Sequence, residues 1–114
     1  MIKMIAMLKR KEHLSHEAFV EHWEKTHGPL AFNVPGLRRY VQSHILSEQF
    51  RDDIPSMNFE ADGIAELWFD DAEALTKAHH SAEMQRLLAD GATFIGEIKT
   101  YLVDEIPVPH VSTM

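Results

Sequence analysis

Cysteine is absent from this chain of 114 residues. Without thiols the chain has no disulfide, no thiolate nucleophile and no cysteine-based zinc site, and this usage is compatible with a reducing compartment. Long apolar runs are absent too, which argues against a membrane-spanning segment, and the first residues lack the apolar core of a signal peptide. We therefore expect a cytoplasmic protein that does not interact with membranes.

Positive charge is scarce. Lys and Arg number 11 against 18 Asp and Glu, which gives a net charge of −7, and the longest basic run is Lys9-Arg10-Lys11. This balance argues against a nucleic-acid partner. The hydrophobic share of 45% and the charged share of 25% are typical of a folded domain, and the length suits a single core. We expect one domain over residues 1–106 and an extended tail over residues 107–114.

Apolar periodicity and capping residues predict seven elements. Strands are expected over residues 2–10, 37–46, 64–69 and 98–106. Helices are expected from Ser15, from Asp70-Asp71 to about His80, and from Ser81 to Gly91. This order predicts an α+β protein with the ferredoxin-like split βαβ fold, in which a four-stranded antiparallel sheet carries its helices on one face.

The acidic stretch over residues 47–63 has no clear element. Loops of this length are uncommon in compact domains unless they act as lids, binding loops or interface arms. Its sequence does not choose among these three roles.

Alternation assigns each strand residue to a face. The sets with the better helix-packing character are Val41-Ser43-Ile45 and Ala65-Leu67-Phe69, whereas Tyr40-Gln42-His44 and Glu66-Trp68 mix aromatic with polar groups. A mixed face suits a partner subunit, a ligand cavity or both. Because helices on one side leave the other sheet face uncovered, we predict a homodimer that pairs sheet to sheet.

The first helix carries the main chemical candidate. At about 100° per residue, His27 falls on the same side as Phe19 and Trp23, and Gly28-Pro29 is expected to break the helix directly after it. A lone inward-facing histidine is more often a hydrogen-bonded structural residue than a catalyst, and its ordinary pKa near 6.5 permits both roles. The helix pattern alone does not decide between them.

Other candidate contacts come from the strands and the later helices. Tyr40 matters chemically only if its hydroxyl points into the same cavity as His27, and Trp68 is a core or cavity-wall residue. Glu66 has three readings: a base in the pocket, a partner of Arg38 or Arg39, or an exposed residue at the dimer edge. His44 shares the face of Tyr40, and His79 lies where it could line the mouth of a cavity. Although the chain has eight histidines, no pair has the co-facial spacing of metal ligands, and we expect no metal site.

Four motifs occur in a familiar order. They are Ser15-His16-Glu17-x-Phe19, His22-Trp23-x-x-x-His27-Gly28-Pro29-Leu30, Pro35-Gly36-Leu37-x-x-Tyr40 and Asp62-Gly63-x-Ala65-Glu66-Leu67-Trp68-Phe69. Over about residues 1–105 the chain thus resembles the EthD-like family of dimeric α+β barrel proteins. The resemblance implies a barrel formed by two subunits and leaves the reaction open, since the family also includes polyketide-cyclase relatives and proteins encoded with oxygenases of ether or aromatic degradation.

Within that family the chain has some similarity to the methylmuconolactone methylisomerase type, which rearranges an unsaturated lactone carboxylate without metal or organic cofactor. The similarity implies that His27 and Tyr40 are the catalytic residues and that no cofactor is needed. Leu67 stands where the isomerase type has a cysteine, so a thiol role is absent here.

We therefore expect a cofactor-independent enzyme of isomerase or cyclase type that acts by proton transfer on a small hydrophobic or aromatic-derived, lactone-like metabolite. His27 would move the proton and Tyr40 would position or protonate an oxygen. The remaining side chains expected to contact substrate are Phe19, Trp23, His44, Glu66, Trp68 and His79. Two alternatives stay open: a non-catalytic binding or accessory protein for an oxygenase pathway, and a cofactor-less monooxygenase.

Overall fold

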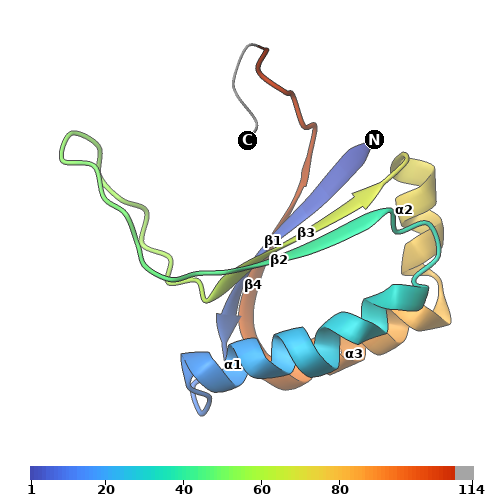
Figure 1. The fold of residues 1–114 in the computed structure, drawn as a ribbon, viewed down its shortest axis with the longest axis horizontal. Coiled ribbons are helices and arrows are strands. Elements are labelled where there is room, and N and C mark those ends of the chain that lie inside the picture. The colour runs from blue at the N-terminus through green and yellow to red at the C-terminus, as the bar shows by residue number, and fades with distance from the viewer. Residues whose placement is uncertain (110–114) are drawn as a thin grey trace.

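A single four-stranded antiparallel sheet organises the computed structural model, which describes residues 1–109. Its strand order is β2-β3-β1-β4, with β1 at Ile2–Arg10, β2 at Arg39–His44, β3 at Gly63–Phe69 and β4 at Ile95–Val103. The helices α1 (His16–His22), α2 (Ala72–His79) and α3 (Ala82–Phe94) all lie on one side of the sheet (Figure 1). The ferredoxin-like α+β fold is confirmed.

Each helix begins at a capping side chain that the sequence predicts. Ser15, Asp71 and Ser81 accept hydrogen bonds from the backbone N–H groups of Ala18, Ala74 and Met84. Such a cap stabilises a helix by about 1 kcal/mol because it satisfies a donor that has no partner within the helix.

The helical path does not break at Gly28-Pro29, so that expectation is wrong. A π-helical turn over Trp23–His27 (η1) follows α1, and a 3₁₀ helix over Gly28–Asn33 (η2) continues the path. Proline is tolerated here because it occupies the first turn of η2, where its missing N–H costs nothing. The π turn, a feature frequent at functional sites, buries both Trp23 and His27.

Several element boundaries differ from the expected ones. Helix α3 runs through Gly91 to Phe94 and passes directly into β4, so β4 begins at Ile95 rather than at residue 98. Gly91 lies within α3 instead of ending it, and a Cβ there would make only ordinary contacts, 3.6 Å from His27 Cε1. Strand β2 is shorter than expected and begins at Arg39.

The sheet register corrects one face assignment. Tyr40 pairs with Leu67 and Gln42 with Ala65, so Tyr40, Gln42 and His44 point toward the helices. The expectation that Val41-Ser43-Ile45 pack on the helices is therefore wrong, whereas that for Ala65 and Leu67 is right. The polar Gln42 is accommodated on this side because its amide nitrogen donates to the carbonyl of Trp23.

An aromatic cluster fills the space between the sheet and the helices. Trp23, Phe19, Phe69 and Phe94 are fully buried, and the Phe19 ring lies 5.7 Å from that of Trp23 and 5.2 Å from that of Phe94. These tilted contacts add to the burial energy and fix α1 and η1 against α3. Among residues 1–109, no helix has the length and apolar character to cross a membrane.

Residues 46–61 leave this body between β2 and β3 as an extended segment, which we call the arm (Figure 1). Residues 104–109 follow β4 without regular structure. The expected tail over residues 107–114 is described only to residue 109, and the rest of that prediction lies outside the described residues.

Candidate functional site

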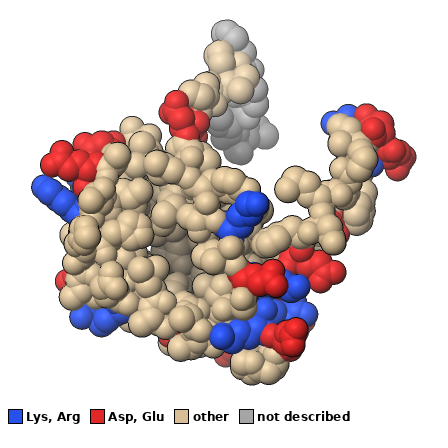
Figure 2. Space-filling model, turned by 180° about the vertical axis from the view of Figure 1, so that it is seen from behind, with Lys and Arg blue, Asp and Glu red and all other residues tan. Residues whose placement is uncertain are grey.

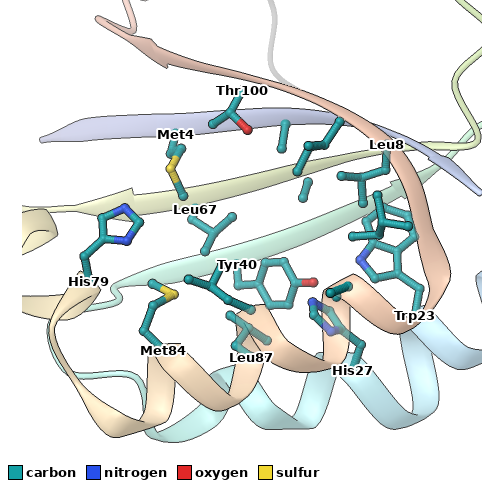
Figure 3. A pocket seen from close by; sticks show the side chains of 17 residues that line it. Met4, Leu8, Trp23, His27, Tyr40, Leu67, His79, Met84, Leu87 and Thr100 are labelled. Atoms are coloured by element: carbon teal, nitrogen blue, oxygen red, sulfur yellow. The ribbon is translucent and has the colours of Figure 1, made fainter.

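A cavity of about 400 Å³ lies between the sheet, η1 and α3 (Figure 3). Its volume falls in the range of small-molecule sites. Most of its lining is apolar and comes from the sheet and α3; examples are Met4, Ala6, Leu8, Leu67, Met84 and Leu87. In Figure 2 a hollow is visible in the body, surrounded mainly by residues other than Lys, Arg, Asp and Glu. The cavity therefore suits a small, largely apolar molecule.

His27 and Tyr40 line the same cavity. The π turn presents the imidazole from the helical layer, and β2 presents the phenol from the sheet, so that the Tyr40 hydroxyl lies beside the His27 ring in Figure 3. A chemical role for Tyr40 requires its hydroxyl to share a cavity with His27, and this arrangement meets that requirement.

A hydrogen bond to Asp90 orients the His27 ring. Its Oδ2 lies 2.8 Å from His27 Nδ1, so an ionised Asp90 accepts a hydrogen bond from the Nδ1–H group. In this tautomer of the neutral ring, Nε2 carries no proton and has a free lone pair. His27 Nε2 makes no hydrogen bond to the described residues. Among these residues, every fully buried side-chain nitrogen has a hydrogen-bond partner, so Nε2 is not fully buried. Nε2 is therefore open to the accessible space of the cavity rather than enclosed by protein.

Burial sets the electrostatics of His27. Only 8% of the residue is exposed, and this desolvation lowers its pKa below 6.5 because the charged form loses hydration. The Asp90 hydrogen bond and charge act in the opposite direction, while a positive charge on His22 would lower the pKa further. Near neutral pH the ring is thus a neutral base whose orientation is fixed by a carboxylate.

His22 extends this network toward solvent. Its Nε2 lies 3.0 Å from Asp90 Oδ2, and about a third of its side chain is exposed. Asp90 is not among the candidate residues that the sequence predicts. Periodicity carries no signal for Asp90, because its partners lie 63 and 68 residues away and meet it only when α1 and η1 pack on α3.

Gln42 orients the phenol of Tyr40. Its Nε2 donates to the Tyr40 oxygen at 2.9 Å and to the Trp23 carbonyl at 2.8 Å. Burial raises the pKa of Tyr40, so the hydroxyl keeps its proton at neutral pH. Since the phenol oxygen already accepts from Gln42, its O–H is left to donate to another oxygen.

The other predicted contact residues divide into three groups. Trp23 and His79 line the cavity. Phe19 is fully buried in the aromatic core, and His44 stacks on Trp23 at 5.1 Å and bonds to Gln42, so both lie behind the lining.

Glu66 and Trp68 lie on the opposite face of the sheet. Glu66 pairs with Lys3 at 2.8 Å, and neither Arg38 nor Arg39 is its partner. The Trp68 ring lies between Lys3 and Arg39, with cation-to-centroid distances of 5.0 and 4.7 Å. Its N–H donates to Glu105 at 3.1 Å. Neither residue reaches the cavity from this face.

The described part of the chain contains no group of three or more His, Asp or Glu side chains arranged to hold a metal ion. His22, His27 and Asp90 are close together, but both ring nitrogens that face Asp90 are at hydrogen-bonding distance from it.

Comparison with known proteins gives a family match and many structural matches. The family model of the EthD domain matches residues 11–98. An EthD family protein from Bacillus halodurans shares 28% identity, with 93% of this chain and 99% of that chain covered and a TM-score of 0.75. Comparison with curated proteins gave no match.

Two more distant structures share the fold. A protein from Thermobifida fusca, described as a dimeric ferredoxin-like protein of unknown function, is 15% identical over 90% of this chain and 88% of that chain, with a TM-score of 0.68. SnoaB from Streptomyces nogalater, described as a cofactor-independent oxygenase, is 13% identical over 96% of this chain and 97% of that chain, with a TM-score of 0.63.

Proposed function

The chain belongs to the EthD domain family, and from that premise we propose that it is a cofactor-independent enzyme that transfers a proton within a small, largely apolar metabolite. The observation that carries the proposal is the Asp90–His27 pair at 2.8 Å, which fixes a neutral imidazole at the wall of an apolar cavity. Aromatic-derived and lactone-like carbonyl compounds fit this cavity in size and polarity.

His27 and Tyr40 have separate roles in the proposed reaction. His27 Nε2 takes a proton from a carbon next to the substrate carbonyl, and the positive ring that forms is stabilised by Asp90. Tyr40 donates its hydrogen bond to the carbonyl oxygen, where negative charge develops. His27 then returns the proton to another carbon of the substrate, which completes an isomerisation. In a cyclisation the carbanion first adds to a second carbonyl carbon of the same molecule, the C=O electron pair moves to that oxygen, and His27 returns the proton to the alkoxide. Neither reaction changes the net number of protons or electrons.

A homodimer that pairs through the uncovered sheet face forms part of the proposal. That face carries half-buried apolar side chains, among them Ile5, Met7, Val41 and Ile64. A sheet in water buries such a face against another layer. The dimeric description of the Thermobifida fusca neighbour supports a dimer.

Replacement of His27 by Gln tests the enzymatic proposal. Gln keeps a polar side chain of similar reach but cannot take up a proton, so turnover of an unsaturated lactone or a polyketide-like phenol should fall at least about 100-fold. Ligand binding, followed through the fluorescence of Trp23 in the cavity wall, should change little. The exposed His13 provides the matched control, because His13→Gln removes an imidazole that is not part of the cavity lining.

Two results would favour the alternatives. If wild-type protein binds these compounds tightly but turns over none of them, the cavity belongs to a binding or accessory protein. If turnover consumes dioxygen in an oxygen-electrode assay, the reaction is a cofactor-less oxygenation, the activity described for SnoaB. Retention of full turnover by His27→Gln would contradict the role of His27 in both reactions.

A further inference from the structure

The arm is fixed at its base and free along its length. The N–H of Ile45 donates to the carbonyl of Asp62 at 3.1 Å, which closes the base. The Asp62 carboxylate, almost fully buried, accepts hydrogen bonds from the backbone N–H and the guanidinium of Arg10 and lies 2.8 Å from His16 Nδ1. The base therefore holds the arm in a defined direction.

Beyond the base, the arm exposes apolar side chains. Every residue from 46 to 58 is exposed, and the large apolar ones are Leu46 at 96%, Phe50 at 68%, Ile54 at 51% and Met57 at 77%. The side-chain hydrogen bonds of the arm in the described structure stay within it, such as the pair of Arg51 with Asp53. Four large apolar side chains on one extended segment indicate a surface that another molecule covers.

The dimensions of the chain lead to the same conclusion. Its surface of 8204 Å² exceeds by about 1,800 Å² the value expected for a compact monomer of 13.1 kDa. Its radius of gyration of 15.4 Å exceeds the value of about 13 Å expected for this length. A standard protein interface takes about 800 Å² from each partner, so the excess is sufficient for a stable dimer.

The arm leaves the body on a particular side. It and the segment after β4 both extend away from the sheet on the side opposite to the helices (Figure 1). That segment is anchored over the uncovered face, because Glu105 lies 2.7 Å from Lys3 and accepts the hydrogen bond of Trp68. A second sheet placed against the uncovered face would thus have the arm along its flank.

We propose that the arm packs its apolar side chains onto a second copy of this chain and clasps the dimer formed by the two uncovered sheet faces. The proposal rests on the dimer of the proposed function and adds the segment that holds it together. The two copies exchange arms by symmetry, so each dimer contains two such contacts.

Paired substitutions measure the contribution of the arm. Phe50→Ser combined with Met57→Ser should raise the dimer dissociation constant at least about tenfold in sedimentation velocity, because a few large side chains carry most of the energy of an interface. Phe32→Ser is the matched control: Phe32 is 83% exposed on η2, on the helical side of the sheet. Unchanged circular dichroism confirms that both variants are folded.

A crosslink identifies the surface that the arm contacts. Because the chain has no cysteine, Phe50→Cys carries a benzophenone at one defined site. Labelled subunits are mixed with ¹⁵N-enriched unlabelled subunits, irradiated and digested. Crosslinked peptides that join the two isotopic forms support the proposal, and the same label at Phe32→Cys should give none.

The outcomes separate this inference from the proposed function. A dimer whose dissociation constant is unaffected by the arm variant, with crosslinks only inside one chain, overturns the arm proposal and leaves the sheet-to-sheet dimer. A wild-type monomer at micromolar concentration overturns both. Neither result affects the His27 assay, which concerns the cavity of a single subunit.

Discussion

In the proposed reaction, Asp90 determines which nitrogen of His27 would act as the base, because its Oδ2 lies 2.8 Å from Nδ1. In Asp90→Asn the carboxamide can donate to Nδ1, which would move the proton to Nε2 and remove the lone pair from the cavity. Because the Asp90 charge raises the pKa of His27, the variant should also titrate at a lower pH than wild type, as measured by NMR of the His27 ring. His22→Gln is the matched control and should shift the pKa upward. Equal His27 titration curves in all three proteins would contradict the network.

Burial of neutral His27 also makes the stability of the protein depend on pH. Because the pKa of His27 is lowered in the folded state, the unfolded chain binds more protons below pH 6.5, and this contribution to stability is present above that value. It is lost as the pH falls from 6.5 through the lower folded pKa. Urea unfolding of wild type and His27→Gln at pH 7.5 and pH 5.0 tests this sign. The free energy of unfolding should decrease more in wild type than in the variant.

Elements were predictable where local residues determine them. The capping residues Ser15, Asp71 and Ser81 predict where the helices begin, and in the structure each accepts the expected hydrogen bond from the backbone. The face of β2 was not predictable, because Gln42 looks like a residue for an exposed face until the Trp23 carbonyl is placed beside it. The joining of α1, η1 and η2 was missed because Gly28-Pro29 is a helix-breaking signal in general, whereas Pro29 here occupies the first turn of a new 3₁₀ helix, where proline is tolerated.

Gly63 shows how closely two elements approach. A Cβ on this first residue of β3 would overlap the ring of Trp23, which is fully buried. Gly63→Ala should therefore lower the free energy of unfolding by about 1–3 kcal/mol. Gly91→Ala, where a Cβ meets only ordinary contacts at 3.4 and 3.6 Å, should leave it unchanged or raise it slightly through helix propensity. Thermal and urea denaturation of both variants checks the contrast, and a Gly63→Ala protein as stable as wild type would refute it.

At the scale of the whole molecule, the order of the strands and helices was enough to predict the fold. It was not enough to predict which side chains meet at the cavity. The motifs placed His27 and Tyr40 in the chain, but the register of β2 against β3 was needed to put both at one cavity. The same register leaves Glu66 and Trp68 on the face opposite to the helices, as expected, and separates them from Tyr40, Gln42 and His44. Periodicity of 2 shows which residues alternate, but it does not show which of the two faces meets the helices.

The uncovered face gives the last prediction. Ile64 lies on β3, an inner strand of the sheet, and is half-buried in a single subunit. A lysine there can extend into water in the monomer, but in a sheet-to-sheet dimer its charge would be trapped between two layers at a cost of several kcal/mol. Ile64→Lys should therefore be a folded monomer in sedimentation equilibrium at concentrations where wild type and Phe32→Lys are dimers. A dimeric Ile64→Lys protein would show that the subunits pair through another surface.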